Sequence, residues 1–386
     1  MLRLKRRGSG AAAGSDGRSG GAERTIRQAG AALRTVRRAG EAMRAVRRFT
    51  AVCCTLAMLA GASAGIVRAA PSAGGEAPSL DIYAERRAMF ERVSMLTGIP
   101  WHVLAAIDQY ERTLTKARPK SRPQPKGLIA IYIPPARWAG ELNPDEEETD
   151  PAVIRHFGGI GLDGNGDGRA DRTDDEDILW TVAQQLLKSG TSEDDLAIGL
   201  WEYYHNSRAV QRVLQFSKLY AHFDRLDLDE HAFPLPVRAD YSYRDTWGAA
   251  RGWGGYRIHE GTDIFADYGV PVRSTCYGVV ETKGWNRFGG WRIGIRDIDN
   301  VYHYFAHLSG YDKNLKPGDI VKPGQVIGWV GSSGYGKPGT SGKFPPHLHF
   351  GLYRDRGLVE WAFDPYPLLK KWEREDWQRI RNGTYR

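Results

Sequence analysis

The spacing of hydrophobic residues along this chain changes near residue 226 and separates a helical region from a region of strands. Between residues 81 and 225, apolar side chains recur every three or four positions, as at Ile82, Met89, Val93 and Leu96, which is the period of an amphipathic helix. Similar patterns predict a second helix with Val103, Leu104, Ile107 and Tyr110 inward, and further helices over about 174–189, 193–204 and 209–223. Residues 81–225 are therefore expected to form an all-α domain.

After a linker over 226–244, the hydrophobic period becomes two from Ile258 onward, which is typical of half-buried strands. Pro323-Gly324 predicts the turn of a β-hairpin within Val321–Gly331. Other short strand patterns, separated by glycines, are Val270–Arg273, Gly278–Glu281, Trp291–Ile295 and Val301–Phe305. We expect an antiparallel sheet or small barrel over 245–368 and a C-terminal tail over 369–386. The fold class is multidomain α + β.

The first 70 residues hold a basic arm followed by an apolar segment. Residues 1–48 contain thirteen Arg or Lys residues against three acidic ones, a balance of +10, so the chain total of +8 leaves −2 for the rest. This pattern is typical of a membrane orientation signal, and no nucleic-acid partner is expected. Phe49–Val67 is uncharged and long enough to cross a bilayer, and Ala62-Ser63-Ala64 fits a cleavage site. Residues 49–70 are thus a cleaved signal or a membrane anchor, and everything after about residue 70 is expected outside the cytoplasm.

An acidic loop in the helical region has the spacing of a calcium-binding loop. Gly168 would take the sharp turn at loop position 6. The predicted Ca2+ ligands at positions 1, 3, 5, 7, 9 and 12 are Asp163, Asn165, Asp167, Arg169 (through its carbonyl), Asp171 and Asp174. The last ligand is Asp and not the usual bidentate Glu, so a plain acidic turn is the alternative.

Five of the ten histidines fall between residues 259 and 349. His347 and His349 are two apart, so on a strand both side chains point to the same face. His259 and Asp263 add a nitrogen and an oxygen ligand. Three protein ligands with a fourth position left for water is the arrangement of a catalytic zinc site. The sequence therefore predicts Zn2+ in this region.

These residues resemble the M23 (lysostaphin-type) zinc metallopeptidases. The motifs are His259-x-Gly-x-Asp263, His307 in Tyr-x-x-His-Leu and His347-x-His349, within about residues 245–366. The resemblance implies that His259, Asp263 and His349 bind zinc, and that His307 and His347 act on the water and the oxyanion. It extends to sporulation-associated peptidoglycan endopeptidases, including ones that cut L-Ala–D-Glu. His303 is interpreted as a supporting or structural residue.

The helical region resembles the lytic transglycosylase (lysozyme-like) fold, through Gly98-Ile-Pro-Trp-His-Val-Leu-Ala-Ala-Ile107, Ile133-Pro-Pro-Ala-Arg-Trp138 and the acidic loop. The resemblance implies that Glu111 occupies the position of the general acid that cuts glycan. Arg112 follows it where the family has Ser or Thr, and a Lys/Arg/Pro run over Lys116–Lys126 replaces a Gly/Gln-rich segment. The favoured interpretation is a surface or capping Glu111 in a degenerate domain that binds glycan.

Three functions remain open from the sequence. The leading one is a zinc endopeptidase of bacterial cell-wall peptides with a helical domain that engages glycan. The second adds glycan cleavage by Glu111 and makes the protein bifunctional. The third is a cell-wall-binding protein without catalysis, which the complete set of motif residues disfavours.

Overall fold

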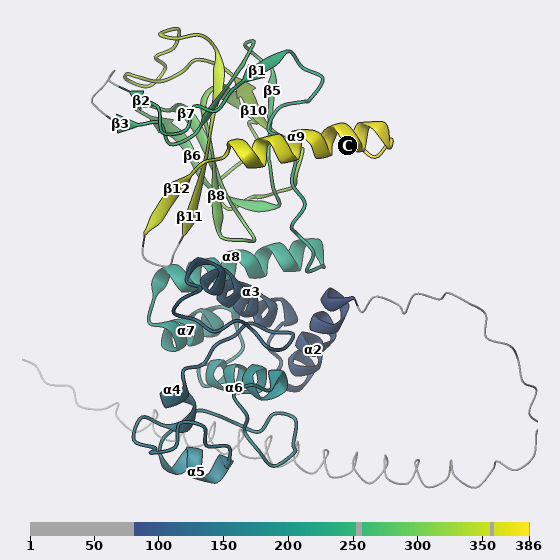
Figure 1. Cartoon of the computed structure of the whole chain (residues 1–386), viewed down its shortest axis with the longest axis vertical. Helices are drawn as coiled ribbons and strands as arrows, with labels where there is room; N and C mark the ends of the chain where they lie inside the picture. Colours follow the sequence, from purple (N-terminus) through teal and green to yellow (C-terminus); the bar gives the residue numbers. More distant parts are fainter. Residues whose placement is uncertain (1–80, 252–256, 356–358, 386) are drawn as a thin grey trace, which may run out of the picture. The chain divides into compact units, whose positions relative to one another are not determined.

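The computed structural model describes residues 81–251, 257–355 and 359–385, so the basic arm (1–48) and the predicted signal or anchor (49–70) lie outside the described residues. No helix within the described ranges is long and apolar enough to span a membrane. The helices are α2 (Ile82–Thr97), α3 (Trp101–Ala117), α4 (Pro135–Ala139), α5 (Pro151–His156), α6 (Asp175–Leu187), α7 (Glu193–Tyr204), α8 (Ser207–Phe223) and α9 (Tyr366–Arg381). All but α9 precede the strands, as the sequence predicted (Figure 1).

Helix α2 begins and ends where the sequence predicts, but it buries a different face. The Asp81 carboxylate accepts the first free N–H groups of the helix, and Gly98 takes a left-handed conformation (φ 76°) that stops it. The buried positions include Met89 and Val93, as expected. Ile82 and Leu96 were expected inward as well, and this was wrong, because they are 51% and 69% exposed.

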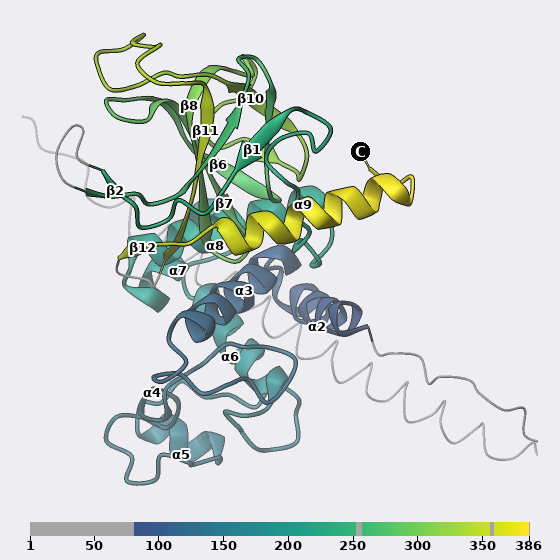
Figure 2. The ribbon, with the colours of Figure 1, turned by 45° about the horizontal axis from the view of Figure 1, so that its top comes forward.

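Helix α3 is the centre of the helical core and packs along α8 (Figures 1 and 2). Its four predicted inward residues are all buried, with Leu104 and Ile107 completely inaccessible. Helix α8 contributes Val213 and Phe216 to the same core. These contacts fix α8 in place, and its outer side is free to face the sheet.

The strands form one large antiparallel sheet and a separate β2–β3 pair. In the large sheet the order β1-β4-β11-β8-β7-β6-β9 is continuous, β10 joins β5 to β8, and β12 pairs with β11. The strands are β1 (Tyr241–Tyr243), β2 (Ala250–Arg251), β3 (Arg257–Ile258), β4 (Thr262–Ala266), β5 (Pro271–Arg273), β6 (Gly278–Asn286), β7 (Gly290–Asp297), β8 (Val301–Tyr311), β9 (Ile320–Val321), β10 (Val326–Val330), β11 (His347–Asp355) and β12 (Glu360–Phe363).

The hairpin predicted through Pro323-Gly324 does not form. The chain turns there, but β9 pairs with β6, while β10 pairs with β5 and β8. The apolar pattern of Val321–Gly331 fits any neighbouring strand equally well. The pairing is therefore decided by the whole sheet.

Both ends of the predicted sheet domain extend further than expected. Tyr241–Tyr243, expected in the linker, form β1 and pair with β4. Most of the expected tail belongs to α9, whose Leu369 and Trp372 are buried in the core of the sheet. Figure 2 shows α9 lying along the sheet.

The helical region and the sheet meet through buried charges. Arg212 on α8 forms an ion pair with Glu281 on β6, and Glu281 also accepts from Arg296 on β7 (3.0 Å). The turn between β7 and β8 lies against α3, where the Gln109 amide donates to the Ile298 carbonyl (3.0 Å). Pro78–Arg386 accordingly forms one compact unit.

Candidate metal centre

Two neighbouring strands bring together the three residues predicted to bind zinc. His349 on β11 lies directly opposite Asp263 on β4 in the antiparallel register, and His259 stands just before β4. Asp263 Oδ1 lies 3.1 Å from His259 Nε2 and 3.0 Å from His349 Nδ1, and the two nitrogens are 2.9 Å apart. We call His259, Asp263 and His349 the groove cluster.

The backbone around the groove cluster explains the glycine of its motif. A Cβ on Gly261 would lie 2.5 Å from the Phe350 carbonyl oxygen and 2.7 Å from the His349 ring. Only glycine allows the two strands to approach this closely. His259 Nδ1 donates to the Thr246 carbonyl (2.8 Å), which orients its Nε2 toward Asp263, as is usual for zinc-binding histidines.

Asp263 has the ionisation state that a cation site needs. Burial acts to raise its pKa, but hydrogen bonds from His259 and His349 hold the pKa of Asp263 well below its usual range. The two imidazole nitrogens and the carboxylate oxygen lie within 4.8 Å of one another. Two nitrogens and one oxygen at this spacing fit zinc.

His307 and His347 flank the groove cluster, as predicted. His347 lies two residues before His349 on β11, with Nε2 3.8 Å from Asp263 Oδ1. His307 on β8 has a left-handed backbone (φ 64°), and its ring centre lies 4.8 Å from that of His347. Each has its Nδ1 tied to a carbonyl oxygen, of Ser333 for His307 and of Pro345 for His347. Both rings are therefore held in a fixed orientation, with Nδ1 as the hydrogen-bond donor.

The pKa of His307 is lowered to about 3, first by burial and then by the neighbouring His347 and His349. A neutral imidazole at pH 7 with Nδ1 as a donor presents the lone pair of Nε2. Such a ring can accept a proton from water. A neutral ring is the starting state of a general base, and the lowered pKa makes His307 a weak one.

The site opens into a groove of about 1000 Å³. His259, His307 and His349 line one part of it. Helix α8 contributes Arg208 and Arg212 to another part, so the helical region forms a wall of the groove. Aromatic and polar residues of the sheet complete the lining, among them Phe288, Arg292, Tyr304, Tyr335 and Tyr353.

His303 lies apart from the groove cluster. It is 1% exposed and bonds to Asp297 (3.0 Å) and to the Thr275 hydroxyl (2.6 Å). His307 follows His303 by four positions, and on a regular strand this spacing would place both side chains on one face. The irregular pairing of β7 with β8 and the left-handed conformation of His307 change that relation.

Glu111 on α3 is buried, so the favoured interpretation of a surface or capping residue was wrong. It is 2% exposed and forms an ion pair with Arg122 from the Lys/Arg/Pro run. Burial raises the pKa of Glu111, and the Arg122 guanidinium opposes that rise. A role as glycan general acid stays a prediction.

The acidic loop is organised by hydrogen bonds to its own backbone. Asp163 accepts from the N–H groups of Gly166 and Gly168, and Asp174 caps the start of α6. Asp177, which the sequence prediction did not include, accepts from three loop N–H groups. These contacts are those of an acidic turn, and calcium binding stays a prediction.

The groove residue that sequence reasoning missed is Arg292. Its side chain lies 6.0 Å from the centre of the Tyr304 ring, and that ring contacts His349 edge-on at 5.9 Å. The nearby Arg212 and Arg296 are paired with Glu281. Among the described residues, no carboxylate lies within ion-pair distance of Arg292. No local spacing signals this, because the residues around Arg292 come from separate strands.

Comparisons with known proteins agree with the site. Residues 257–361 match Peptidase family M23. The chain is 58% identical over 309 residues to the L-Ala–D-Glu endopeptidase of Bacillus subtilis (strain 168), covering 80% of this chain and 94% of that protein. It is 41% identical over 115 residues to lysostaphin of Staphylococcus staphylolyticus, covering 29% of this chain and 22% of that protein. The solved catalytic domain of lysostaphin from Staphylococcus simulans is 34% identical, with a TM-score of 0.30, and the match covers 36% of this chain and 99% of that one.

Proposed function

Because the chain belongs to peptidase family M23, we propose that it is a zinc-dependent endopeptidase that hydrolyses the L-Ala–D-Glu bond of peptidoglycan. The observation that carries this proposal is the groove cluster with His307 and His347 beside it, at the wall of a groove wide enough for a peptide. The relative named L-Ala–D-Glu endopeptidase matches over most of both chains and supports the choice of bond.

The mechanism assigns each residue a separate task. His259, Asp263 and His349 would hold zinc, which supplies an activated water and polarises the scissile carbonyl. One of His307 and His347 accepts the proton of the attacking water through Nε2, and that proton passes to the leaving amine. The other steadies the oxyanion. The Ser333 and Pro345 carbonyls hold both rings in position for these steps.

Arg292 would account for a preference of the groove for D-Glu. A glutamate within a peptide uses one carboxyl to continue the chain, so the other remains free as a carboxylate. Arg292 is a groove cation one aromatic ring away from His349. Arginine binds carboxylates through two parallel N–H bonds. We therefore assign Arg292 to recognition of the free D-Glu carboxylate.

Product analysis tests the function directly. The purified full chain is incubated with peptidoglycan and the fragments are identified by mass spectrometry. We expect new L-Ala carboxyl ends and D-Glu amino ends, both abolished by a chelator and by His349→Ala. Cleavage at another bond would overturn the substrate assignment, and the absence of products from several wall types would overturn the enzymatic one.

The same experiment tests the remaining predictions about the helical region. We propose that it engages glycan, on its sequence resemblance to lytic transglycosylases. If Glu111 also cuts glycan, the products contain anhydro-muropeptides that Glu111→Gln removes. If they contain none, Glu111 does not cut glycan. Action in sporulation, the calcium loop and placement outside the membrane by residues 49–70 stay predictions.

A further inference from the structure

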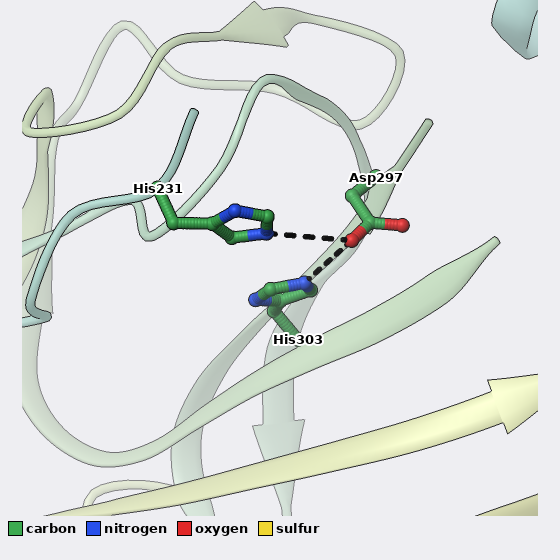
Figure 3. A group of neighbouring side chains, drawn as sticks. All are labelled: His231, Asp297 and His303. Atoms are coloured by element: carbon green, nitrogen blue, oxygen red, sulfur yellow. Dashed lines mark hydrogen bonds and ion pairs between the residues drawn. The ribbon is translucent and has the colours of Figure 1, made fainter. Parts of the chain in front are cut away.

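A second group of two histidines and one aspartate lies outside the groove. His231 comes from the connector between α8 and β1, Asp297 ends β7, and His303 lies near the start of β8. Figure 3 shows both rings directed at the same oxygen of Asp297. That oxygen, Oδ2, lies 3.0 Å from His303 Nε2 and 3.9 Å from His231 Nε2. We call these three residues the connector cluster.

The spacing of the connector cluster fits a metal ion. Its three ligand atoms lie within 4.8 Å of one another, as those of the groove cluster do. Ligand atoms around a tetrahedral zinc, each about 2.1 Å from it, are roughly 3.4 Å apart. The two distances to Asp297 Oδ2 lie on either side of that value. An ion could therefore enter with small side-chain shifts.

The outer nitrogens of both rings are also held as they are in metal sites. His231 Nδ1 donates to the Asp229 carbonyl (2.7 Å). His303 Nδ1 lies 2.6 Å from the Thr275 hydroxyl, which can accept or donate. In metal sites, the second ring nitrogen of a histidine characteristically forms a hydrogen bond with such an oxygen. Asp297 is oriented as well, because its Oδ1 accepts the Val301 N–H (2.7 Å).

The hydrogen bond of His231 favours a cation at this point. With the proton on Nδ1, a neutral His231 ring directs the lone pair of Nε2 at a carboxylate oxygen. Two electron-rich atoms repel each other unless a positive charge lies between them. That charge is either a second proton on His231 or a metal ion shared by all three residues.

We propose that the connector cluster is a second zinc site with a structural role. Two imidazoles and one carboxylate are ligands that zinc accepts, with water in the fourth position on the partly exposed side of His231. The ion joins the connector to the sheet beside the β7–β8 turn, and that turn contacts α3. Trp372 of α9 stacks on His231 at 4.8 Å and closes the other side. The site thus fastens the segment that links the helical region to the catalytic sheet.

Zinc content tests the proposal independently of peptidase activity. The full chain is equilibrated with zinc, freed of excess by gel filtration, and analysed for metal. We expect about two zinc ions per chain in the wild type, about one in His231→Ala or in His349→Ala, and none in the double variant. His222→Ala, which removes an exposed histidine of α8, should keep both.

Two further measurements test the second zinc site if His231→Ala is unstable. Asp297→Asn keeps the shape and the acceptor for Val301 but removes the charge, and it should also lose one zinc. In the His349→Ala background, added zinc should raise the melting temperature, and Asp297→Asn should abolish that rise. A wild type with one zinc, lost entirely in His349→Ala, would overturn the proposal and leave a proton as the shared cation.

Discussion

The groove cluster and the connector cluster each contain two histidines and one aspartate beside the same sheet, and they differ in their surroundings. Two more histidines stand beside the groove cluster, and a groove of about 1000 Å³ gives a peptide access to it. The connector cluster has Trp372 stacked against it, and none of its residues lines that groove. The donors determine which cation binds. The surroundings determine whether that cation can meet a substrate.

Because of this difference, we expect the groove cluster to serve catalysis and the connector cluster to stabilise the fold. The groove cluster joins two strands that the sheet already pairs, so a cation there adds little that the backbone does not hold. The connector cluster joins the connector to β7 and β8, and the connector's other backbone contacts with the sheet include an isolated bridge between His231 and Cys276 and a bond from the Arg273 N–H to the Pro234 carbonyl (2.8 Å). Removing a ligand should therefore cost activity in the first cluster and stability in the second.

The largest expected effect is on the two histidines that only the groove cluster has. His307→Ala and His347→Ala should each lower kcat by about 10²- to 10⁴-fold, because each removes a proton-transfer or oxyanion-stabilising group. Zinc content should stay at the wild-type level in both. Steady-state kinetics and metal analysis measure the two properties separately. His231→Ala is the matched control and should keep kcat, and a comparable loss of kcat there would erase the distinction.

A smaller effect on activity is expected when Arg292, the arginine in the groove, is replaced. Arg292→Gln should raise KM for an L-Ala–D-Glu substrate about 10- to 100-fold, the value of one charge-assisted contact. A substrate in which the free carboxyl of D-Glu is converted to an amide should be poorer for the wild type by the same factor and equal for the variant. Arg292→Lys should recover only part of the affinity, because lysine cannot bind a carboxylate through two parallel bonds. Equal discrimination by wild type and Arg292→Gln would remove Arg292 from substrate recognition.

The contrast between the clusters also explains what the sequence could predict. His347-x-His349 and His259-x-Gly-x-Asp263 are local patterns, and strand periodicity converts them directly into side chains on one face. The buried face of α3 could also be predicted from the sequence, because four apolar residues at helical spacing define it. The connector cluster has no such pattern. Its members lie on three segments that meet only after the sheet, the connector and α9 have packed together.

The remaining errors have the same origin in long-range packing. The turn at Pro323-Gly324 was correctly placed, but whether its flanking strands pair with each other depends on the other strands. Helix α9 was taken for a tail because charged residues surround its few buried ones, Leu369 and Trp372. The predicted cleaved signal or membrane anchor over residues 49–70 lies outside the described residues and stays a prediction.

A third buried set of charges, around Glu281, should have a smaller and pH-dependent effect on stability. Glu281 is balanced by the guanidinium groups of Arg212 and Arg296 and by no imidazole. Its stability contribution should therefore respond to acid and be indifferent to chelators. Burial acts to raise the pKa of Glu281, but the charges and hydrogen bonds of Arg296 and Arg212 hold it below the ordinary value of 4.5.

The direction of the pH effect follows from that lowered pKa. The ionic contribution of Glu281 is fully present above pH 4.5, the unfolded value, and is lost as the pH falls through the lower folded value. Glu281→Gln should reduce the free energy of unfolding by about 2 kcal/mol at pH 7. The gap to the wild type should close in acid and stay unchanged with chelator, as measured by urea unfolding. Glu202→Gln, an exposed glutamate on α7, should show no gap. A gap that persists unchanged at low pH would mean that the carboxylate charge of Glu281 stabilises nothing, and that shape alone holds α8 to the sheet.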